Sequence, residues 1–401
     1  MVLLLRGLDL MSKNKNIIAI IYIFLMMFLS AMCDNVRGPF VPIIKKEFSI
    51  DNKGIATTLM ICSIGYMIFT FVGGILCEKI GQKKVFILGF MIMILAPIGL
   101  YFSKNFAIYL IELFLLNTGQ AFIGIATNTI IPVIAIGFQA ILMNLTHFSY
   151  GLGATLTQRV AGIMLYKGIT WRQIYMFIAI TSIIMFIGFL FVNIPQPHIS
   201  KEDNKIDNKE ILKNKFIYLY MFALGFYVAA ESNTGNWFVN FMHDCYKYNE
   251  NKTSIYAALF FGTFTVGRLL GGFIVEKIGY MKSVLLSVAL AAILYMIGLL
   301  IGERGIVMIS VSGIFFAIIF PTMVLSINQV FKKNTAYVTG LVITAASFMS
   351  MIINILIGIL NDSIGTYKTY YIIPLSLTLS VIFTYLIYIN TKKIPDKSRR
   401  G

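Results

Sequence analysis

Charge is scarce in this sequence. Only 12% of its 401 residues are Asp, Glu, Lys or Arg, whereas a soluble domain carries about a quarter. Hydrophobic residues make up 58%, and the mean hydropathy is +0.83. Too few charged side chains are present to cover a water-facing globule. The composition therefore excludes a soluble enzyme, a secreted disulfide scaffold and a disordered protein.

Cysteine and histidine are also scarce, with 4 and 3 residues. Cys33, Cys62 and Cys77 fall in or at the ends of apolar runs and Cys245 falls in a loop, so they form neither a metal-ligand spacing nor a disulfide framework. The P-loop, His-Glu-x-x-His and Gly-x-Ser-x-Gly motifs are missing as well. We therefore expect no cofactor, no metal and no enzymatic activity. A membrane-embedded enzyme stays open as an alternative that demonstrated product chemistry would support.

Long apolar runs are what the chain has instead. Runs of about 18 or more apolar residues predict membrane-spanning helices, and they stay apolar for about twice the length of a barrel strand, which argues against a β-barrel. We predict an all-α membrane protein with twelve transmembrane helices. Their approximate limits are 17–42, 54–77, 85–103, 106–134, 140–166, 173–194, 216–241, 253–275, 283–301, 306–331, 337–360 and 369–390.

Basic residues give the chain a net charge of +16. They sit in short loops between apolar spans, where they orient helices, so we expect no nucleic-acid partner. Lys and Arg are roughly twice as frequent in the loops of one side as in those of the other. This bias predicts a multi-pass protein of the cell membrane with both termini in the cytoplasm. We expect the lipid bilayer and a small-molecule substrate as partners of a monomer.

One segment reads as a linker. Residues 195–215 run from Pro-Gln-Pro-His into a stretch rich in Lys, Asp, Glu and Asn, while most other connections are very short. The segment divides the spans six and six. We expect an N-terminal bundle over residues 1–194, a cytoplasmic linker over 195–215 and a C-terminal bundle over 216–401.

A repeat relates the two halves. Residues 73–81 and 271–279 share the pattern Gly-Gly-x-x-x-Glu-Lys-Ile-Gly, and each copy ends the second span of its half. The simplest cause is a pair of parallel six-helix bundles related by an axis along the membrane normal. Two pseudo-symmetric six-helix bundles of this kind enclose a central cavity that opens to either side by rocking.

The repeat contains candidate gating residues. A glycine without a side chain lets a neighbouring helix approach closely, and a carboxylate at the membrane face can reach the positive end of a neighbouring helix or a loop cation. Such contacts would hold one conformation, although a role in topology alone remains open. The candidates are Gly73, Glu78, Lys79, Gly81, Glu276 and Lys277.

The loop from Gly73 to Lys84, its weaker copy at 271–282 and the six-plus-six layout resemble the major facilitator superfamily. In that superfamily's signature Gly-x-x-x-Asp-Arg-x-Gly-Arg-Lys, Glu78 replaces the Asp and Lys79 replaces the Arg. The resemblance implies the twelve-helix transporter fold. It leaves the substrate open.

Three further stretches, 37–48, 147–154 and 231–237, resemble the fucose–glucose type of sugar/proton symporter. This resemblance implies a sugar-like substrate. One position departs from that branch, where the fourth helix often carries a Glu four residues before an Asn. Here Asn128 is present, Gly124 stands in place of the Glu, and Glu112 is the only acid of that helix.

Six ionisable residues lie inside the spans, three acids and three bases. An ionisable group at bilayer depth costs about 2.5–3.5 kcal/mol, so it usually faces a partner or a watery cavity. The equal numbers suggest mutual pairing, with the pairs left open. The acids, Asp34, Glu112 and Glu231, are the candidates for proton coupling, and the bases are Arg37, Arg159 and Arg268, of which Arg37 and Arg268 are candidate gating residues.

Asp34 and Glu231 are the strongest of these candidates, because each lies in the first helix of its half. A carboxylate beside an amide offers donors and acceptors to sugar hydroxyls, and burial favours the protonated form of an acid. A structural or gating pair of Asp34 with Arg37 remains an alternative. The candidate substrate-binding residues are Asp34, Asn35, Gln120, Asn128, Gln158, Arg159, Glu231, Asn233, Asn236, Trp237, Asn328, Gln329 and Asn354.

These features predict a secondary active transporter that moves a sugar or a similar small polar solute by alternating access, with protons as the coupling ion. An exporter of drugs or organic anions is the main alternative, since Arg37 and Arg159 suit anions. A solute sensor built on a transporter fold is a second alternative, which predicts binding without flux.

Overall fold

The computed structural model describes residues 16–50, 52–135, 137–195 and 208–391. The described residues form helices and no strands, and the predicted all-α class is confirmed. The helices that precede residue 195 are α2 (Ile17–Asn35), α3 (Arg37–Glu47), α4 (Asn52–Ile80), α5 (Gln82–Phe102), α6 (Phe106–Ile134), α7 (Gln139–Tyr166) and α8 (Trp171–Leu190).

The helices after residue 207 begin with the short α9 (Asn208–Lys213). The tenth predicted span is broken into three α-helical pieces, and the first predicted span, 17–42, runs through α2 into α3. These helices are α10 (Lys215–Tyr246), α11 (Glu250–Ile278), α12 (Tyr280–Ile301), α13 (Ile306–Val311), α14 (Gly313–Phe316), α15 (Ile319–Val330), α16 (Thr335–Ile364), α17 (Thr366–Thr369) and α18 (Ile372–Thr391).

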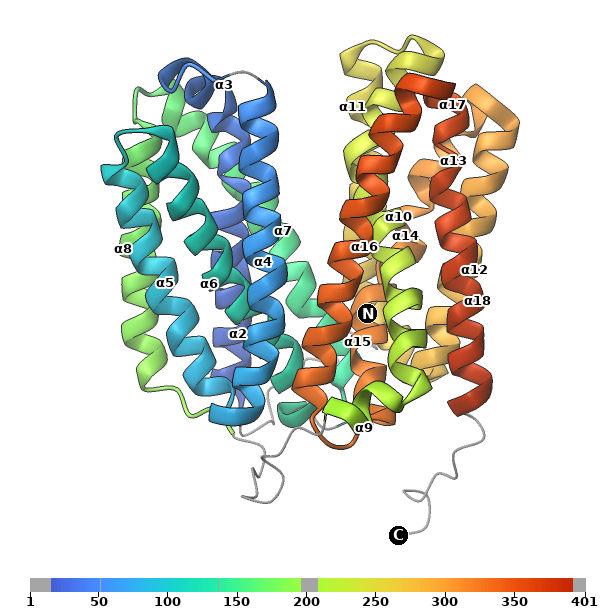
Figure 1. Cartoon of the computed structure of the whole chain (residues 1–401), viewed down its shortest axis with the longest axis horizontal. Coiled ribbons are helices and arrows are strands. Elements are labelled where there is room, and N and C mark those ends of the chain that lie inside the picture. Colours follow the sequence, from blue (N-terminus) through green and yellow to red (C-terminus); the bar gives the residue numbers. More distant parts are fainter. Residues whose placement is uncertain (1–15, 51, 136, 196–207, 392–401) are drawn as a thin grey trace.

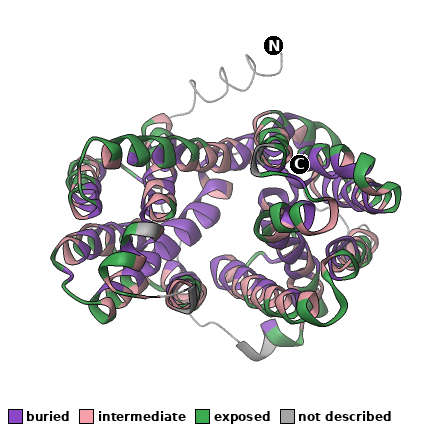
Figure 2. Ribbon diagram, turned by 90° about the horizontal axis from the view of Figure 1, so that it is seen from above, coloured by how far each residue is buried: buried purple, intermediate pink, exposed green. Residues whose placement is uncertain are grey.

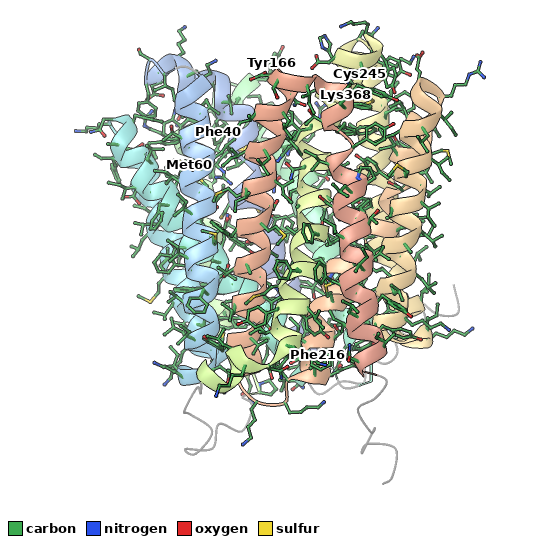
Figure 3. The ribbon with its side chains drawn as sticks, turned by 45° about the vertical axis from the view of Figure 1, so that its right-hand side comes forward. Phe40, Met60, Tyr166, Phe216, Cys245 and Lys368 are labelled. Atoms are coloured by element: carbon green, nitrogen blue, oxygen red, sulfur yellow. The ribbon has the colours of Figure 1, made fainter. Side chains whose placement is uncertain are left out.

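The two sets of helices stand side by side as two bundles, α2–α8 and α10–α18 (Figure 1). In the view from above, exposed residues follow the outer rim and buried ones face inward (Figure 2). Of the predicted linker, residues 196–207 lie outside the described part. One end of the molecule, called here the linker end, carries α9 and Phe216, while Tyr166 and Lys368 lie at the opposite end (Figures 1 and 3).

Nine stretches of the described residues are long and apolar enough to cross a membrane, and one of them, Tyr280–Val330, holds two predicted spans. Helices suit this setting because they satisfy their own backbone hydrogen bonds in lipid. The two spans below this threshold are α7 and α10, which carry polar residues in their interiors. Both helices line the cavity described below, so their polarity follows from their position.

The last glycine of each repeat copy makes the same turn. Gly81 has φ +84° and Gly279 has φ +94°, values that glycine adopts without a steric penalty. Gly81 precedes α5 and Gly279 precedes α12. The glycine of the pattern therefore reverses the chain at the linker end in both halves.

The second glycine of each pair lies where the two bundles touch. A Cβ on Gly74 of α4 would lie 2.8 Å from the carbonyl oxygen of Ala336 in α16. A Cβ on Gly272 of α11 would lie 2.6 Å from the Cα of Ile141 in α7. Both obstacles are backbone atoms of the other bundle. The missing side chains therefore let α4 approach α16, and α11 approach α7.

The first glycine of each pair serves its own bundle. A Cβ on Gly73 would lie 2.7 Å from Ile125 in α6, and one on Gly271 would lie 2.0 Å from Ile318, between α14 and α15. In both halves, the first glycine of the pair therefore packs against a helix of its own bundle, and the second packs against a helix of the other bundle.

Gly272→Ala is expected to weaken the contact between the bundles, because the new methyl group meets backbone that moves only with its helix. The expected result is a longer mean distance between spin labels on the exposed residues Lys84 and Lys332, which belong to different bundles. Gly262→Ala in the same helix is the control, since it gains the same helix propensity and has no atom within 4 Å of its Cβ. Equal distances in the two variants would contradict the role given to Gly272.

Candidate functional site

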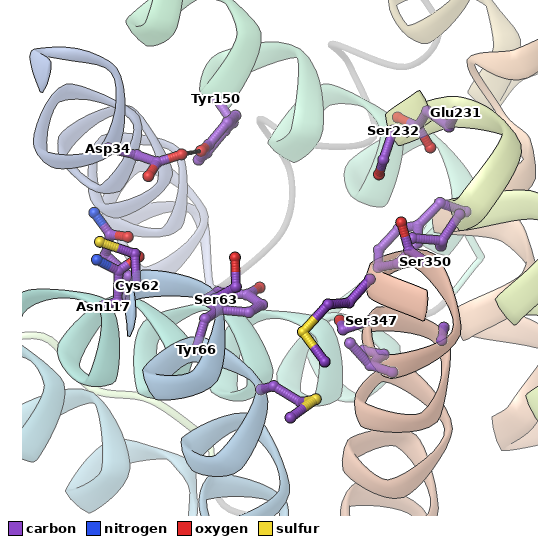
Figure 4. A pocket seen from close by; sticks show the side chains of 18 of the residues that line it. Asp34, Cys62, Ser63, Tyr66, Asn117, Tyr150, Glu231, Ser232, Ser347 and Ser350 are labelled. Atoms are coloured by element: carbon purple, nitrogen blue, oxygen red, sulfur yellow. Dashed lines mark hydrogen bonds between the residues drawn. The ribbon is translucent and has the colours of Figure 1, made fainter. Parts of the chain in front are cut away.

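A cavity of about 740 Å³ lies between the bundles and is lined by both of them. Its lining includes hydroxyls, an amide and two carboxylates (Figure 4). Each carboxylate is paired with an arginine that also lines the cavity. The polar and ionisable residues that line it are Ser30, Asp34, Arg37, Cys62, Ser63, Tyr66, Asn117, Gln120, His147, Tyr150, Glu231, Ser232, Asn236, Arg268, Ser347, Ser350 and Asn354.

Asp34 is fully occupied within the first bundle. Its Oδ1 pairs with the Arg37 guanidinium, and its Oδ2 accepts a hydrogen bond of 2.8 Å from the Tyr150 hydroxyl of α7 (Figure 4). Arg37 also donates to the Cys62 Sγ of α4 at 2.6 Å. The pair lies where α2 ends and α3 begins, and its contacts join α2, α3, α4 and α7 at the cavity wall.

Glu231 has a looser partner in the second bundle. Its Oε1 lies 3.7 Å from the Nη2 of Arg268, which is an ion-pair distance but longer than a hydrogen bond. The Arg268 guanidinium also lies 4.2 Å above the ring of Phe264. The first helix of each half thus places one carboxylate at the cavity, and the structure pairs each with an arginine of its own bundle.

A polar stripe on α16 faces these groups. Ser347, Ser350 and Asn354 recur at helical spacing and line the cavity. Trp237 of α10 is not part of the lining. Its indole N–H instead donates to the Asn354 Oδ1 at 2.8 Å. Trp237 therefore orients an amide that faces the cavity.

The carboxylate of Glu78, at the end of α4, reaches the other bundle at the linker end. It accepts hydrogen bonds from the backbone N–H groups of Ala336 at 2.6 Å and Tyr337 at 3.4 Å. These are free donors of the first turn of α16, whose helix dipole favours a negative charge there. Glu78 therefore joins the first bundle to the second.

Glu276 makes the reciprocal contact from the end of α11. It accepts a hydrogen bond of 2.6 Å from the backbone N–H of Ala140, in the first turn of α7. Nearby, the Tyr280 hydroxyl donates to the Gln139 Oε1 at 3.1 Å. Lys79 and Lys277 are exposed in the last turns of their helices, where a positive charge complements the helix dipole.

Several predicted substrate-binding residues lie away from the cavity, because helix rotation turns them elsewhere. Asn35 donates to the Ala31 carbonyl in its own helix, and Gln158 donates to Asn35 at a marginal 3.5 Å. Arg159 is exposed and is not part of the lining. Asn128 and Asn233 are buried inside their bundles.

Three more of the predicted residues, Asn328, Gln329 and Glu112, lie near helix ends and do not line the cavity. Asn328 and Gln329 fall in the last turn of α15, where the Asn328 carbonyl accepts from Lys332. Glu112 packs against Gly99, between α6 and α5, and does not line the cavity. The placement of these three residues therefore gives no support to their expected roles in substrate binding or proton coupling.

Some residues that line the cavity belong to none of the predicted sets. Ser63 and Tyr66 sit one helical turn apart on α4 (Figure 4), and Asn117 faces them from α6. Small polar residues at three- to four-residue spacing within apolar helices were the available signal. His147 and Tyr150 fall within the stretch 147–154, but nothing in the sequence links Tyr150 to Asp34.

Two helical bundles that meet at one end around a polar cavity define a membrane transporter. The chain matches the model of the Major Facilitator Superfamily over residues 23–304 and again over 232–401. It belongs to this superfamily, and it is a transporter rather than an enzyme.

Known transporters resemble most of the chain. The glucose/galactose transporter of Brucella abortus biovar 1 (strain 9-941) is 22% identical over 383 residues, which cover 90% of this chain and 92% of that protein. The fucose:proton symporter of E. coli shares the fold with a TM-score of 0.80, at 16% identity, over 93% of this chain and 99% of that chain. The human organic anion transporter MFSD10 also shares it, with a TM-score of 0.70 at 12% identity, over 91% of this chain and 98% of that chain.

Glu78→Gln is expected to loosen the linker end, because it removes the charge while keeping an oxygen for the Ala336 N–H. An anion at a helix start contributes about 0.3–1 kcal/mol, so the population open at this end should rise by about two- to fivefold. The spin-label distance between Lys84 and Lys332 measures this shift. Glu303→Gln is the control, since Glu303 is exposed and pairs with Lys252. An unchanged distance in the Glu78 variant would count against the contact.

Proposed function

We propose that this protein is a secondary active transporter that moves a sugar or a similar small polar solute, coupled to protons. The cavity carries the proposal, since it combines hydroxyls and amides with charges that are already paired. Such groups hydrogen-bond a polyhydroxyl solute, while Met27, Phe320 and Met351 offer apolar surface to its C–H faces. The name of the Brucella relative, a glucose/galactose transporter, supports the same substrate class.

The transport cycle we propose is alternating access. The bundles 1–194 and 216–401 act as the two moving units, and the Glu78 and Glu276 contacts latch the linker end. With the linker in the cytoplasm, as the Lys and Arg bias favours, this conformation is open to the outside of the cell membrane. One chain surrounds the whole cavity, so we propose a monomer with both termini in the cytoplasm.

An anion exporter is the alternative that intramembrane arginines favour. In the described structure, the two arginines at the cavity, Arg37 and Arg268, are each neutralised by a carboxylate. Arg159 does not line the cavity. An anion entering this cavity would have to displace a carboxylate from its arginine, which costs interaction energy that a neutral solute does not lose. The charge arrangement therefore supports a neutral solute over an anion.

Purified protein in liposomes is expected to accumulate a radiolabelled sugar such as glucose, galactose or fucose when an inward proton gradient is imposed. Uptake should fall to simple equilibration when the gradient is collapsed. Organic anions tested in parallel should neither be taken up nor compete. Anion uptake without sugar uptake would instead favour the exporter, and binding without any flux would favour a sensor.

Ser350→Ala is expected to raise KM for the transported sugar by about two- to tenfold, which corresponds to the loss of one hydrogen bond of about 0.5–1.5 kcal/mol. Ser363→Ala is the matched control, because Ser363 lies in the same helix and its hydroxyl bonds only to the Leu360 carbonyl of that helix at 3.3 Å. Initial uptake rates over a range of sugar concentrations measure both variants. A KM that is equal in the two variants would remove Ser350 from the proposed site.

A further inference from the structure

We propose that Glu231, and not Asp34, is the acid that couples protons to transport, and that α11 carries its protonation state to the contact of Glu276 with the other bundle. This inference rests on the proposed proton-coupled transport. It identifies the acid that takes up the proton and the helix that transmits the change, neither of which follows from the proposed function alone.

The two cavity acids differ in how firmly they are held. Asp34 uses both oxygens, one toward Arg37 and one toward the Tyr150 hydroxyl. Protonating Asp34 would break an ion pair and weaken a hydrogen bond from a second helix. Glu231 is held by an ion pair at 3.7 Å, beyond hydrogen-bond distance, and by a contact with the Tyr227 hydroxyl, which belongs to its own helix. Glu231 is therefore the acid that can take and release a proton with less disturbance of its surroundings.

The partner of Glu231 lies on the helix that closes the linker end. Arg268, Gly272 and Glu276 follow one another at four-residue spacing, so they share one face of α11. Gly272 meets the backbone of α7, and Glu276 binds the first turn of α7. Eight residues of helix span about 12 Å. One rigid rod thus joins the ion pair in the cavity to both closing contacts.

The first bundle has a less direct connection, because its ion pair reaches α4 only through the hydrogen bond from Arg37 to Cys62. The repeat places Thr70 of α4 where α11 has Arg268, and the Thr70 hydroxyl bonds to the Tyr66 carbonyl of its own helix. The arginine of the first bundle, Arg37, is on α3 rather than on α4. The pseudo-symmetry is therefore broken at this position, and the arginine of the ion pair lies on the closing helix itself only in the second bundle.

Other titratable groups near Glu231 are few. Tyr227 on the same helix donates to the Phe316 carbonyl, and His147 of α7 packs edge-on against Phe320 with its Nε2 buried and unpartnered. Among the described residues, α15 and α16 present no titratable side chain to the cavity. Asp34, Arg37, Cys62, Tyr66 and Tyr150 line the wall formed by the first bundle.

The proposed cycle moves one proton with each solute. A proton from the open side binds the Glu231 carboxylate, which becomes neutral and releases Arg268. The unpaired guanidinium is then costly at membrane depth. This cost favours a shift of α11 that brings the Arg268 guanidinium into contact with water or with the solute. The same shift pulls Glu276 away from α7. Release of the proton on the other side restores the ion pair and the closed linker end.

The first test is the number of protons moved per sugar, which does not depend on how fast a variant turns over. A pH-sensitive dye inside liposomes reports protons while radiolabel reports sugar. We expect about one proton per sugar in the wild type and in Asp34→Asn, even where the latter is slow, and none in Glu231→Gln. A wild type that moves sugar without protons would overturn the coupling in the proposed function itself, and this inference with it.

A second readout covers a Glu231 variant that transports nothing. Spin labels on unnatural amino acids at positions 84 and 332 leave the four cysteines in place. We expect the linker end of the wild type and of Asp34→Asn to open as the pH falls from about 8 to about 5, while Glu231→Gln shows no response to pH. Proton coupling retained in Glu231→Gln, a pH response retained in it, or either one lost in Asp34→Asn alone would overturn the assignment.

Discussion

Charge at membrane depth must be paired or hydrated, and this constraint organises the molecule. Four of the six ionisable side chains inside the predicted spans are gathered at one polar cavity, where Asp34 meets Arg37 and Glu231 meets Arg268, while Glu112 and Arg159 lie elsewhere. The two helices too polar for the apolar threshold, α7 and α10, form part of that cavity. The polar side chains that would bind a solute are therefore also the ones that keep α7 and α10 at the central cavity and out of the lipid.

The same constraint explains how the linker end closes. Each repeat copy ends in a carboxylate that satisfies free backbone donors at the start of a helix of the other bundle. Such contacts can hold a conformation and can still break, because an anion at a helix start is stabilised by about 1 kcal/mol. The paired glycines bring the helices close enough for these contacts to form.

Much of the architecture was readable from the chain. Apolar length predicted the spans, and the Gly-Gly-x-x-x-Glu-Lys-Ile-Gly repeat predicted a close helix approach, while the partner of Glu78 stayed open between a helix start, a loop cation and a role in topology alone. The candidate site was harder. Asn354 and Asn236 do line the cavity, whereas Asn328, Gln329 and Arg159 do not. An amide in an apolar helix can face a cavity, a neighbouring helix or an interface. The residue type alone therefore does not predict which way the side chain points.

The sequence by itself determined the membrane-spanning class and the two related halves, because these depend on local composition and on a repeat within the chain. Only the tertiary structure decided which arginine pairs with which acid, that Tyr150 holds Asp34, and that Trp237 orients Asn354. Those contacts join helices far apart in the chain. They depend on how each helix is rotated about its axis, which packing against several neighbours sets at once.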